Sequence, residues 1–197
     1  MSLPFNLPAY LERIRLPARA TVDHHGLSAV QRAHRLAIPF ENLDVPLGRG
    51  IDISSDAVFG KLVVAGRGGY CFEHNRLFLD ALEALGFEAR PLLARVWLNG
   101  GGVPPKTHTL SLVTFGDEQW IADPGFGGSY TPVMPLVDGA EAEAPDGATF
   151  RLVRDAEHGW MLLRDGHSAA TDGRGGGEGF QPQYSFTTDT VWPADLE

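Results

Sequence analysis

The 197-residue sequence has a single cysteine, Cys71, and no apolar run long enough to span a membrane. One cysteine excludes an internal disulfide framework. The N-terminal residues also lack the charged and then apolar pattern of a signal peptide. We therefore expect a cytoplasmic protein.

Positive charge is scarce as well. The 16 lysines and arginines are outnumbered by 25 aspartates and glutamates, so the formal net charge is -9. Such a surface argues against nucleic acid or an anionic membrane as the main partner. An anionic small molecule would need a local pocket rich in cations or N–H groups.

Helical patterns fill the first half of the chain. Apolar residues recur at helical spacing in the segments 7–16, 27–37, 54–64 and 71–85. Ser28 is a candidate cap for the second helix, and Gly86 stands where a helix C-terminal glycine is expected. We interpret residues 1–86 as a helical domain that carries Cys71.

The second half changes to strand patterns. Candidate strands are 88–98, 107–115, 119–123, 149–154, 159–164 and 183–188. Pro91 suggests an edge or a bulge in the first strand. The glycine-rich segment 171–179 is expected to be a flexible loop. The fold class is therefore α+β, with an antiparallel sheet or small barrel over residues 87–190.

Cys71 follows Gly68 and Gly69 and stands at the start of a predicted helix. Unpaired N–H groups and the positive end of the helix dipole favour an anion there, which pushes a thiol toward the nucleophilic thiolate. The glycines would let the backbone turn sharply and approach a ligand. The alternative is a small buried apolar residue, which is the commoner role of a lone cysteine.

A base for Cys71 is predicted from a hairpin. If Gly116-Asp117 is a two-residue turn, 115 pairs with 118, and Asp123 pairs with Leu110. His108 lies on the same face as Leu110, so His108 and Asp123 are diagonal neighbours within side-chain reach. A carboxylate there can fix the imidazole tautomer and stabilise its charged form. The alternatives are a hydrogen-bonded core histidine and a turn aspartate.

His74 is a second possible base, because it follows Cys71 by three residues on the same predicted helix. The other histidines occupy polar or irregular stretches, where we expect surface positions: His24, His25, His34, His158 and His167. Glycines after Asp123 would let an acyl donor pass close to the backbone, or they form a wide loop. They lack the Lys-Ser/Thr ending of a nucleotide phosphate loop.

Several stretches together resemble the arylamine N-acetyltransferase family. They are Tyr10 to Ile14, Ile38 to Asp44, Arg67 to Asn75, Thr107-His108 and Asp123 to Gly127. The Arg-Gly-Gly-Tyr-Cys-Phe-Glu stretch is highly specific, and order and spacing agree across about residues 7–130. Pro124 departs from the small aliphatic residue usual in the family, which suggests a stiffer loop.

The resemblance implies a cysteine-protease-like triad of Cys71, His108 and Asp123. It also implies acetyl-coenzyme A as the acyl donor, an acetyl-cysteine thioester in a ping-pong mechanism, an arylamine or arylhydrazine acceptor, and no metal. Residues that match the family's substrate and coenzyme cleft are Phe40, Thr107, Gly125, Phe126, Gly127 and Gly128. Arg67 and Glu41 match a structural ion pair.

The family fold has an α/β lid after the barrel, and residues 191–197 correspond to its beginning, so the lid is expected to be missing from this chain. Other functions stay open. One is an amide synthase that acts on a carrier-bound polyketide chain, and another is a hydrolase of the papain or transglutaminase kind. A binding or regulatory protein without activity is the third.

Overall fold

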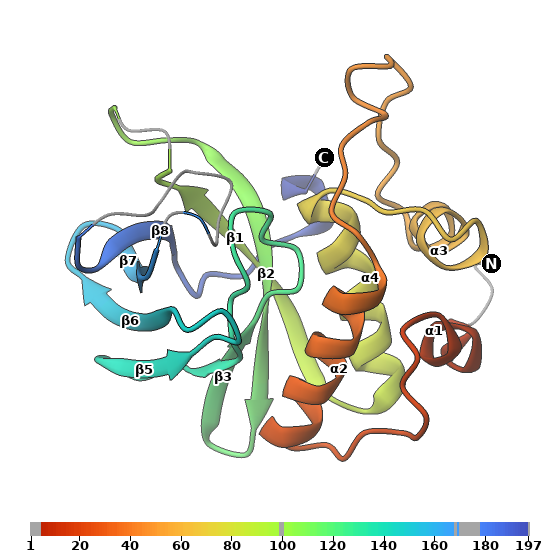
Figure 1. Cartoon of the computed structure of the whole chain (residues 1–197), viewed down its shortest axis with the longest axis horizontal. Helices are drawn as coiled ribbons and strands as arrows, with labels where there is room; N and C mark the ends of the chain where they lie inside the picture. The colour runs from red at the N-terminus through yellow and green to blue at the C-terminus, as the bar shows by residue number, and fades with distance from the viewer. Residues whose placement is uncertain (1–4, 99–100, 168, 170–177, 197) are drawn as a thin grey trace.

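Helices occupy the first half of the chain and strands the second, as the sequence patterns predict (Figure 1). The computed structural model describes residues 5–98, 101–167, 169 and 178–196. Most of the predicted loop 171–179 therefore lies outside the described residues. The helices are α1 (Leu7–Arg13), α2 (His24–Ala37), α3 (Ser55–Phe59), the π-helix η1 (Gly60–Val64), α4 (Cys71–Leu85) and the short 3-10 helix η3 (Pro193–Asp195).

Helix α2 begins three residues before the predicted start. Its N-cap is Asp23, whose carboxylate accepts the Gly26 N–H at 2.8 Å, so the expected cap Ser28 lies inside the helix. Aspartate is among the best N-cap residues because its side chain satisfies a free N–H of the first turn. None of the helices in the described part of the chain is both long and apolar enough to cross a membrane.

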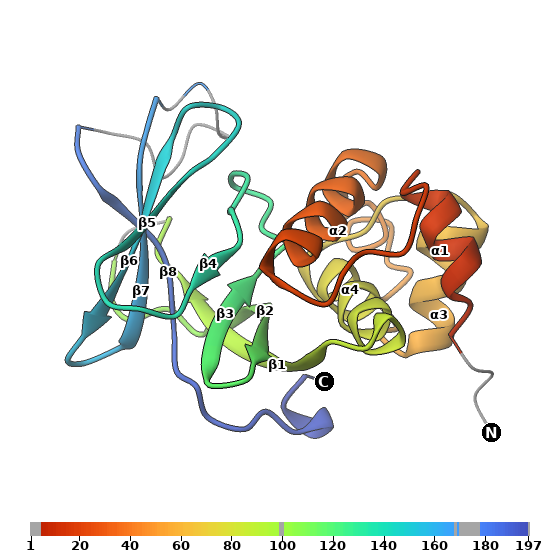
Figure 2. The same cartoon turned by 90° about the horizontal axis from the view of Figure 1, so that it is seen from below.

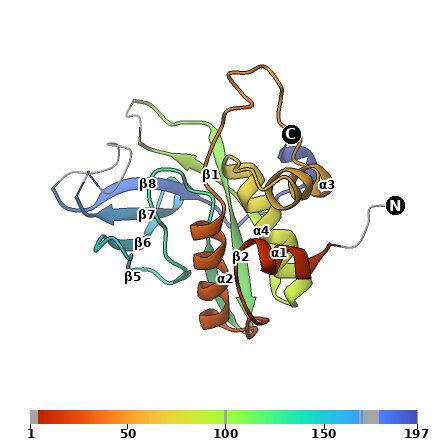
Figure 3. The same ribbon diagram turned by 45° about the vertical axis from the view of Figure 1, so that its right-hand side comes forward.

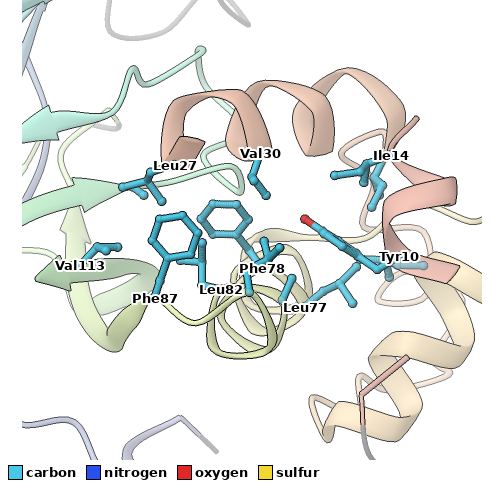
Figure 4. Packing of buried hydrophobic residues seen from close by; sticks show 14 of the residues in the cluster. Tyr10, Ile14, Leu27, Val30, Leu77, Phe78, Leu82, Phe87 and Val113 are labelled. Atoms are coloured by element: carbon cyan, nitrogen blue, oxygen red, sulfur yellow. The ribbon is translucent and has the colours of Figure 1, made fainter. Parts of the chain in front are cut away.

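Helix α4 runs from Cys71 to Leu85, as predicted, and ends at Gly86, whose φ of 97° is left-handed. Its buried face packs against α1 and α2, and Figure 4 shows Leu27 and Val30 of α2 pointing toward Phe78 and Leu82 of α4. This packing holds the first turn of α4 at a fixed place beside the sheet.

The strands form one antiparallel sheet. Its order is β4-β3-β2-β1-β8-β7-β6-β5, and contacts between the edge strands β4 and β5 nearly close it into a barrel (Figure 2). The strands are β1 (Glu88–Val96), β2 (Lys106–Phe115), β3 (Glu118–Ala122), β4 (Met134–Pro135), β5 (Ala140–Glu143), β6 (Thr149–Asp155), β7 (Gly159–Asp165) and β8 (Gln181–Phe186). Strands β4 and β5 were not predicted from the sequence.

The β2–β3 hairpin has the predicted register. Phe115 pairs with Glu118, and the pairing continues without a shift to Ser111 and Ala122. Pro91 lies in a part of β1 that pairs only with β2, because β8 joins β1 from Ala94 onward. Proline is tolerated there since one side of the strand has no ladder partner.

Two apolar clusters stabilise the molecule, one among the helices and one inside the barrel. Val113 of β2 and Ala122 of β3 belong to the helical cluster, whereas Leu110 and Ile121 on the same two strands belong to the barrel cluster. The β2–β3 hairpin thus separates the two cores, with α2 and α4 on one of its faces (Figure 3). This hairpin carries His108 and Asp123 to the first turn of α4.

Candidate active site

The N-terminus of α4 places Cys71. Glu73 accepts the Tyr70 N–H at 3.1 Å and so satisfies a free donor next to the first turn. Cys71 is only partly buried, and its Sγ lies 3.7 Å from the carbonyl oxygen of Thr107 at the start of β2. The sulfur is therefore beside the strand that carries the predicted base.

The glycines before Cys71 allow the backbone to pass close to the segment around Pro39. A Cβ on Gly68 would lie 2.2 Å from the Pro39 carbonyl oxygen, so only glycine fits. Gly69 exchanges backbone hydrogen bonds with this segment, donating to Pro39 at 3.2 Å and accepting from Glu41 at 2.8 Å. The segment before Cys71 is thereby fixed to the loop after α2.

His108 and Asp123 meet as the hairpin register predicts. His108 Nε2 lies 2.7 Å from Asp123 Oδ2, and both side chains are almost fully buried. Since Nε2 is occupied by the carboxylate, Nδ1 is the ring atom left for Cys71. Burial lowers the pKa of His108, but the charge and hydrogen bond of Asp123 and the hydrogen bond of Cys71 raise it to about 10. The site favours a protonated imidazole.

Asp123 is held from several sides. Its Oδ1 accepts from Asn75 Nδ2 at 3.2 Å and from the Gly125 N–H at 3.0 Å. Burial raises the pKa of Asp123, but the charge and hydrogen bond of His108 and the hydrogen bond of Asn75 lower it below its usual range. Asp123 is therefore a carboxylate at neutral pH. Asn75 was missed as a site residue, although it lies one turn after Cys71 on the same helix face.

Two aromatic rings confine the His108 imidazole. The centroid of Phe126 lies 5.2 Å from that of His108, and the centroid of Tyr184 lies 5.3 Å away. Both rings are buried. Phe126 was predicted to line the cleft, whereas Tyr184 on β8 was not predicted, because its contact with His108 joins residues far apart in the sequence. The rings restrict rotation of the imidazole between its two partners.

The other expected cleft residues lie near this group. Phe40 is 45% exposed, and a Cβ on Gly127 would lie 2.8 Å from its ring. A Cβ on Gly125 would lie 2.8 Å from the Cys71 carbonyl oxygen, so this glycine lets the loop pass over the first turn of α4. A Cβ on Gly128 would lie 3.0 Å from Leu98 Cδ1. Their contacts with substrate remain a prediction.

One histidine, His34, differs from expectation. His34, predicted at the surface, is fully buried, and its Nε2 lies 3.0 Å from Nδ1 of His74. The Nε2 of His74 lies 3.2 Å from the Pro39 carbonyl oxygen. Both ring nitrogens of His74 thus have partners other than Cys71, and burial lowers its pKa to about 4. This geometry does not support His74 as the base.

The predicted pair of Arg67 and Glu41, at 2.9 Å, belongs to a larger network. Asp44 accepts from Arg67 at 2.9 Å and from Lys61 at 2.8 Å, and Lys61 reaches Glu73 at 2.7 Å. The sequence gave no sign of Lys61. This network connects the loop after α2 with η1 and the first turn of α4, so it supports the position of Cys71.

A cysteine at a helix start that faces an imidazole oriented by a carboxylate is typical of proteins that use a thiol nucleophile. An N-acetyltransferase family model matches residues 23–197. The arylamine N-acetyltransferase of Mycolicibacterium smegmatis is 39% identical over 201 residues, which is 99% of this chain and 69% of the relative. The chain therefore belongs to the arylamine N-acetyltransferase family, whose members are enzymes.

Other relatives support the assignment to this family. The arylamine N-acetyltransferase of Escherichia coli (strain K12) is 43% identical over 80% of this chain and 56% of the relative. The solved structure of the Salmonella typhimurium arylamine N-acetyltransferase has a TM-score of 0.85 and 38% identity, covering 96% of this chain and 65% of that one. The chain thus spans between about half and two thirds of the length of these relatives.

Proposed function

We propose that this chain transfers an acetyl group from acetyl-coenzyme A to an arylamine or arylhydrazine through a thioester on Cys71. The contact between His108 and Asp123 at 2.7 Å, with the imidazole facing Cys71, is the observation that carries the proposal. A Mycobacterium marinum relative, 33% identical with a TM-score of 0.83, was solved in complex with CoA, which supports this donor.

The first half-reaction forms the thioester. His108 Nδ1 takes the proton of Cys71, and the imidazolium is stabilised by the Asp123 carboxylate. The thiolate attacks the acetyl carbonyl, and the N–H groups at the start of α4 are the candidates for holding the oxyanion. When the intermediate collapses, the bond to the coenzyme sulfur breaks, and His108 returns its proton to the leaving thiolate.

The second half-reaction discharges the thioester. The amine nitrogen attacks the acetyl carbon while His108 takes a proton from it, and Cys71 leaves as the thiolate. Arylamines are weakly basic and keep a free lone pair at neutral pH, whereas an aliphatic amine is mostly protonated and cannot attack. The partly exposed Phe40 ring offers an apolar face for such an acceptor.

The amide-synthase alternative has less support. Proansamycin X synthase of Amycolatopsis mediterranei is 32% identical over 93% of this chain, lower than the 39% of the mycobacterial acetyltransferase. The two functions require different acyl donors. Donor choice is therefore the property to test.

Intact mass spectrometry tests the proposal. Incubation with acetyl-coenzyme A should add one acetyl group to the wild-type chain and none to Cys71→Ala, and aniline should then remove it far faster than water does. Equal discharge by water and aniline would favour a hydrolase. Acylation by a long-chain pantetheine thioester but not by acetyl-coenzyme A would favour the synthase. A wild-type chain that gains no acyl group from either donor would overturn the proposal.

A further inference from the structure

One face of α2 holds the loop that follows Asp123. Gln31 and Arg35 lie one helical turn apart on this face. Gln31 is fully buried, and its side-chain amide accepts the Asp123 N–H and donates to the Thr131 carbonyl, both at 2.7 Å. One side chain therefore fixes both ends of the loop 123–131.

Arg35 holds the middle of the same loop. Its Nη1 donates to the carbonyl oxygens of Pro124, at 3.1 Å, and Phe126, and its Nη2 donates to that of Ser129 at 3.2 Å. The planar guanidinium presents its donors in fixed directions, so it can hold three carbonyls at once. A lysine ammonium is a point charge on a flexible stem and cannot reproduce this arrangement.

The direction of these carbonyls determines where the N–H groups point. In a planar trans peptide the C=O and the following N–H point in opposite directions. The Phe126 carbonyl faces Arg35, so the Gly127 N–H points away from Arg35. Within the described part of the chain, no acceptor meets this N–H. Arg35 thus leaves a donor of the glycine loop free for a ligand.

We propose that Gln31 and Arg35 are positioning residues for acetyl transfer. Gln31 sets Asp123 and, through it, the His108 imidazole, whereas Arg35 sets the loop from Pro124 to Ser129 against which the acyl donor lies. This inference rests on the function proposed above. Neither side chain touches the reacting atoms. The competing explanation is that both only satisfy buried backbone groups.

The single cysteine allows a direct test. Wild type, Gln31→Met, Arg35→Lys and the matched control Arg32→Lys, whose arginine is exposed on the same helix, are compared in two assays. The first measures the rate of Cys71 alkylation by iodoacetamide from pH 5 to pH 10. The second measures acetylation of Cys71 by intact mass as the acetyl-coenzyme A concentration is varied.

Gln31→Met and Arg35→Lys should each differ from the wild type in a different assay. Gln31→Met loosens Asp123, so the imidazolium is less stable and the alkylation midpoint rises by about one pH unit. Arg35→Lys leaves that midpoint in place but raises the acetyl-coenzyme A concentration for half-maximal acetylation about tenfold, because the loop is displaced. Arg32→Lys should match the wild type in both assays.

The proposal is overturned if both variants match Arg32→Lys in both assays and only their unfolding temperatures fall. If Gln31→Met does not fold, Arg35→Lys, which keeps its charge, decides alone. If the wild type gains no acetyl group, the proposed function fails and the role of Arg35 falls with it. The alkylation profile of Gln31→Met then still decides whether Gln31 sets the triad.

Discussion

His34 and His74 share a hydrogen bond of 3.0 Å inside the helical core. The Pro39 carbonyl can only accept, so Nε2 of His74 carries a proton and its Nδ1 accepts from His34. The Nδ1 of His34 then accepts from the Tyr10 hydroxyl at 2.9 Å. One arrangement of protons satisfies all three hydrogen bonds, and both imidazoles are neutral in it.

Acid should break this chain of hydrogen bonds. Burial and the positive charge of the nearby Arg35 together lower the pKa of His74 to about 4 and that of His34 well below its usual value. Because these pKa values are below those of the unfolded chain, stability is full above pH 6.5 and is lost as pH falls toward 4. For His74 the loss is about 3 kcal/mol. Urea unfolding from pH 7 to pH 4 measures it.

The control for the acid effect is His25→Gln, since His25 is exposed on the same helix as His34. His74→Gln should lower stability at pH 7 but flatten its decline toward pH 4, whereas His25→Gln should leave the decline as in the wild type. A decline of wild-type steepness in His74→Gln would show that the loss arises elsewhere.

Alkaline pH should destabilise the protein through His108. The pKa of His108 is raised to about 10 by Asp123, so its stabilising contribution is full below pH 6.5 and is lost as pH rises toward 10. Asp123→Asn should flatten this alkaline decline and slow acetyl transfer about a thousandfold or more, because the imidazole loses its orientation. Unfolding curves and single-turnover rates measure the two effects.

Asp117→Asn is the matched control for Asp123→Asn, because Asp117 is exposed in the turn of the same hairpin. It should change neither the alkaline decline nor the rate. A wild-type rate in Asp123→Asn would remove this residue from the mechanism.

A methyl group at Gly125 should separate the loop from α4. Its Cβ would lie 2.5 Å from Asn75 Nδ2 and 2.8 Å from the Cys71 carbonyl oxygen. Gly125→Ala should therefore destabilise the fold by about 1–3 kcal/mol and reduce acetyl transfer. Gly102→Ala, with open space around the added methyl, is the control. Unchanged activity and stability in Gly125→Ala would contradict the close packing.

Lys61 of η1, whose side chain is 14% exposed, should contribute more to stability than an exposed lysine does. Lys61→Met leaves the Asp44 and Glu73 carboxylates, which are 8% and 2% exposed, without their shared cation. Lys61→Met should therefore lower stability mainly through Glu73, because Asp44 keeps Arg67 as a partner at 2.9 Å. Arg49→Met removes a more distant, exposed partner of Asp44 and should cost under about 1 kcal/mol. Denaturant unfolding of the two variants at matched salt distinguishes these outcomes.

The features that the sequence predicts correctly are those that depend on the periodicity of neighbouring residues. The meeting of His108 and Asp123 follows from a turn at Gly116-Asp117 and the alternation of side chains, and Cys71 follows from a helical pattern that ends at Gly86. These features need only neighbouring residues to be recognised. The family resemblance adds the match of the whole motif set.

The features that the sequence did not predict depend on contacts between residues that are distant along the chain. His34 lies among polar neighbours along the chain, but its partners Tyr10 and His74 come from two other helices. Gln31 looks like a surface residue until Asp123, 92 positions later, folds onto it. The strand Ala140–Glu143 alternates alanine and glutamate on the sheet edge, so its pattern is weak.

The lone sulfur at the tip of α4 also has a consequence for oxidative stress. Peroxide converts a reactive thiolate to a sulfenic acid, which many proteins protect by condensing it with a neighbouring thiol. Within these 197 residues Cys71 has no second cysteine for that purpose. These residues alone can therefore not repair the sulfenic acid with a thiol of their own, and a small thiol or a reductase would have to reach the partly exposed sulfur of Cys71.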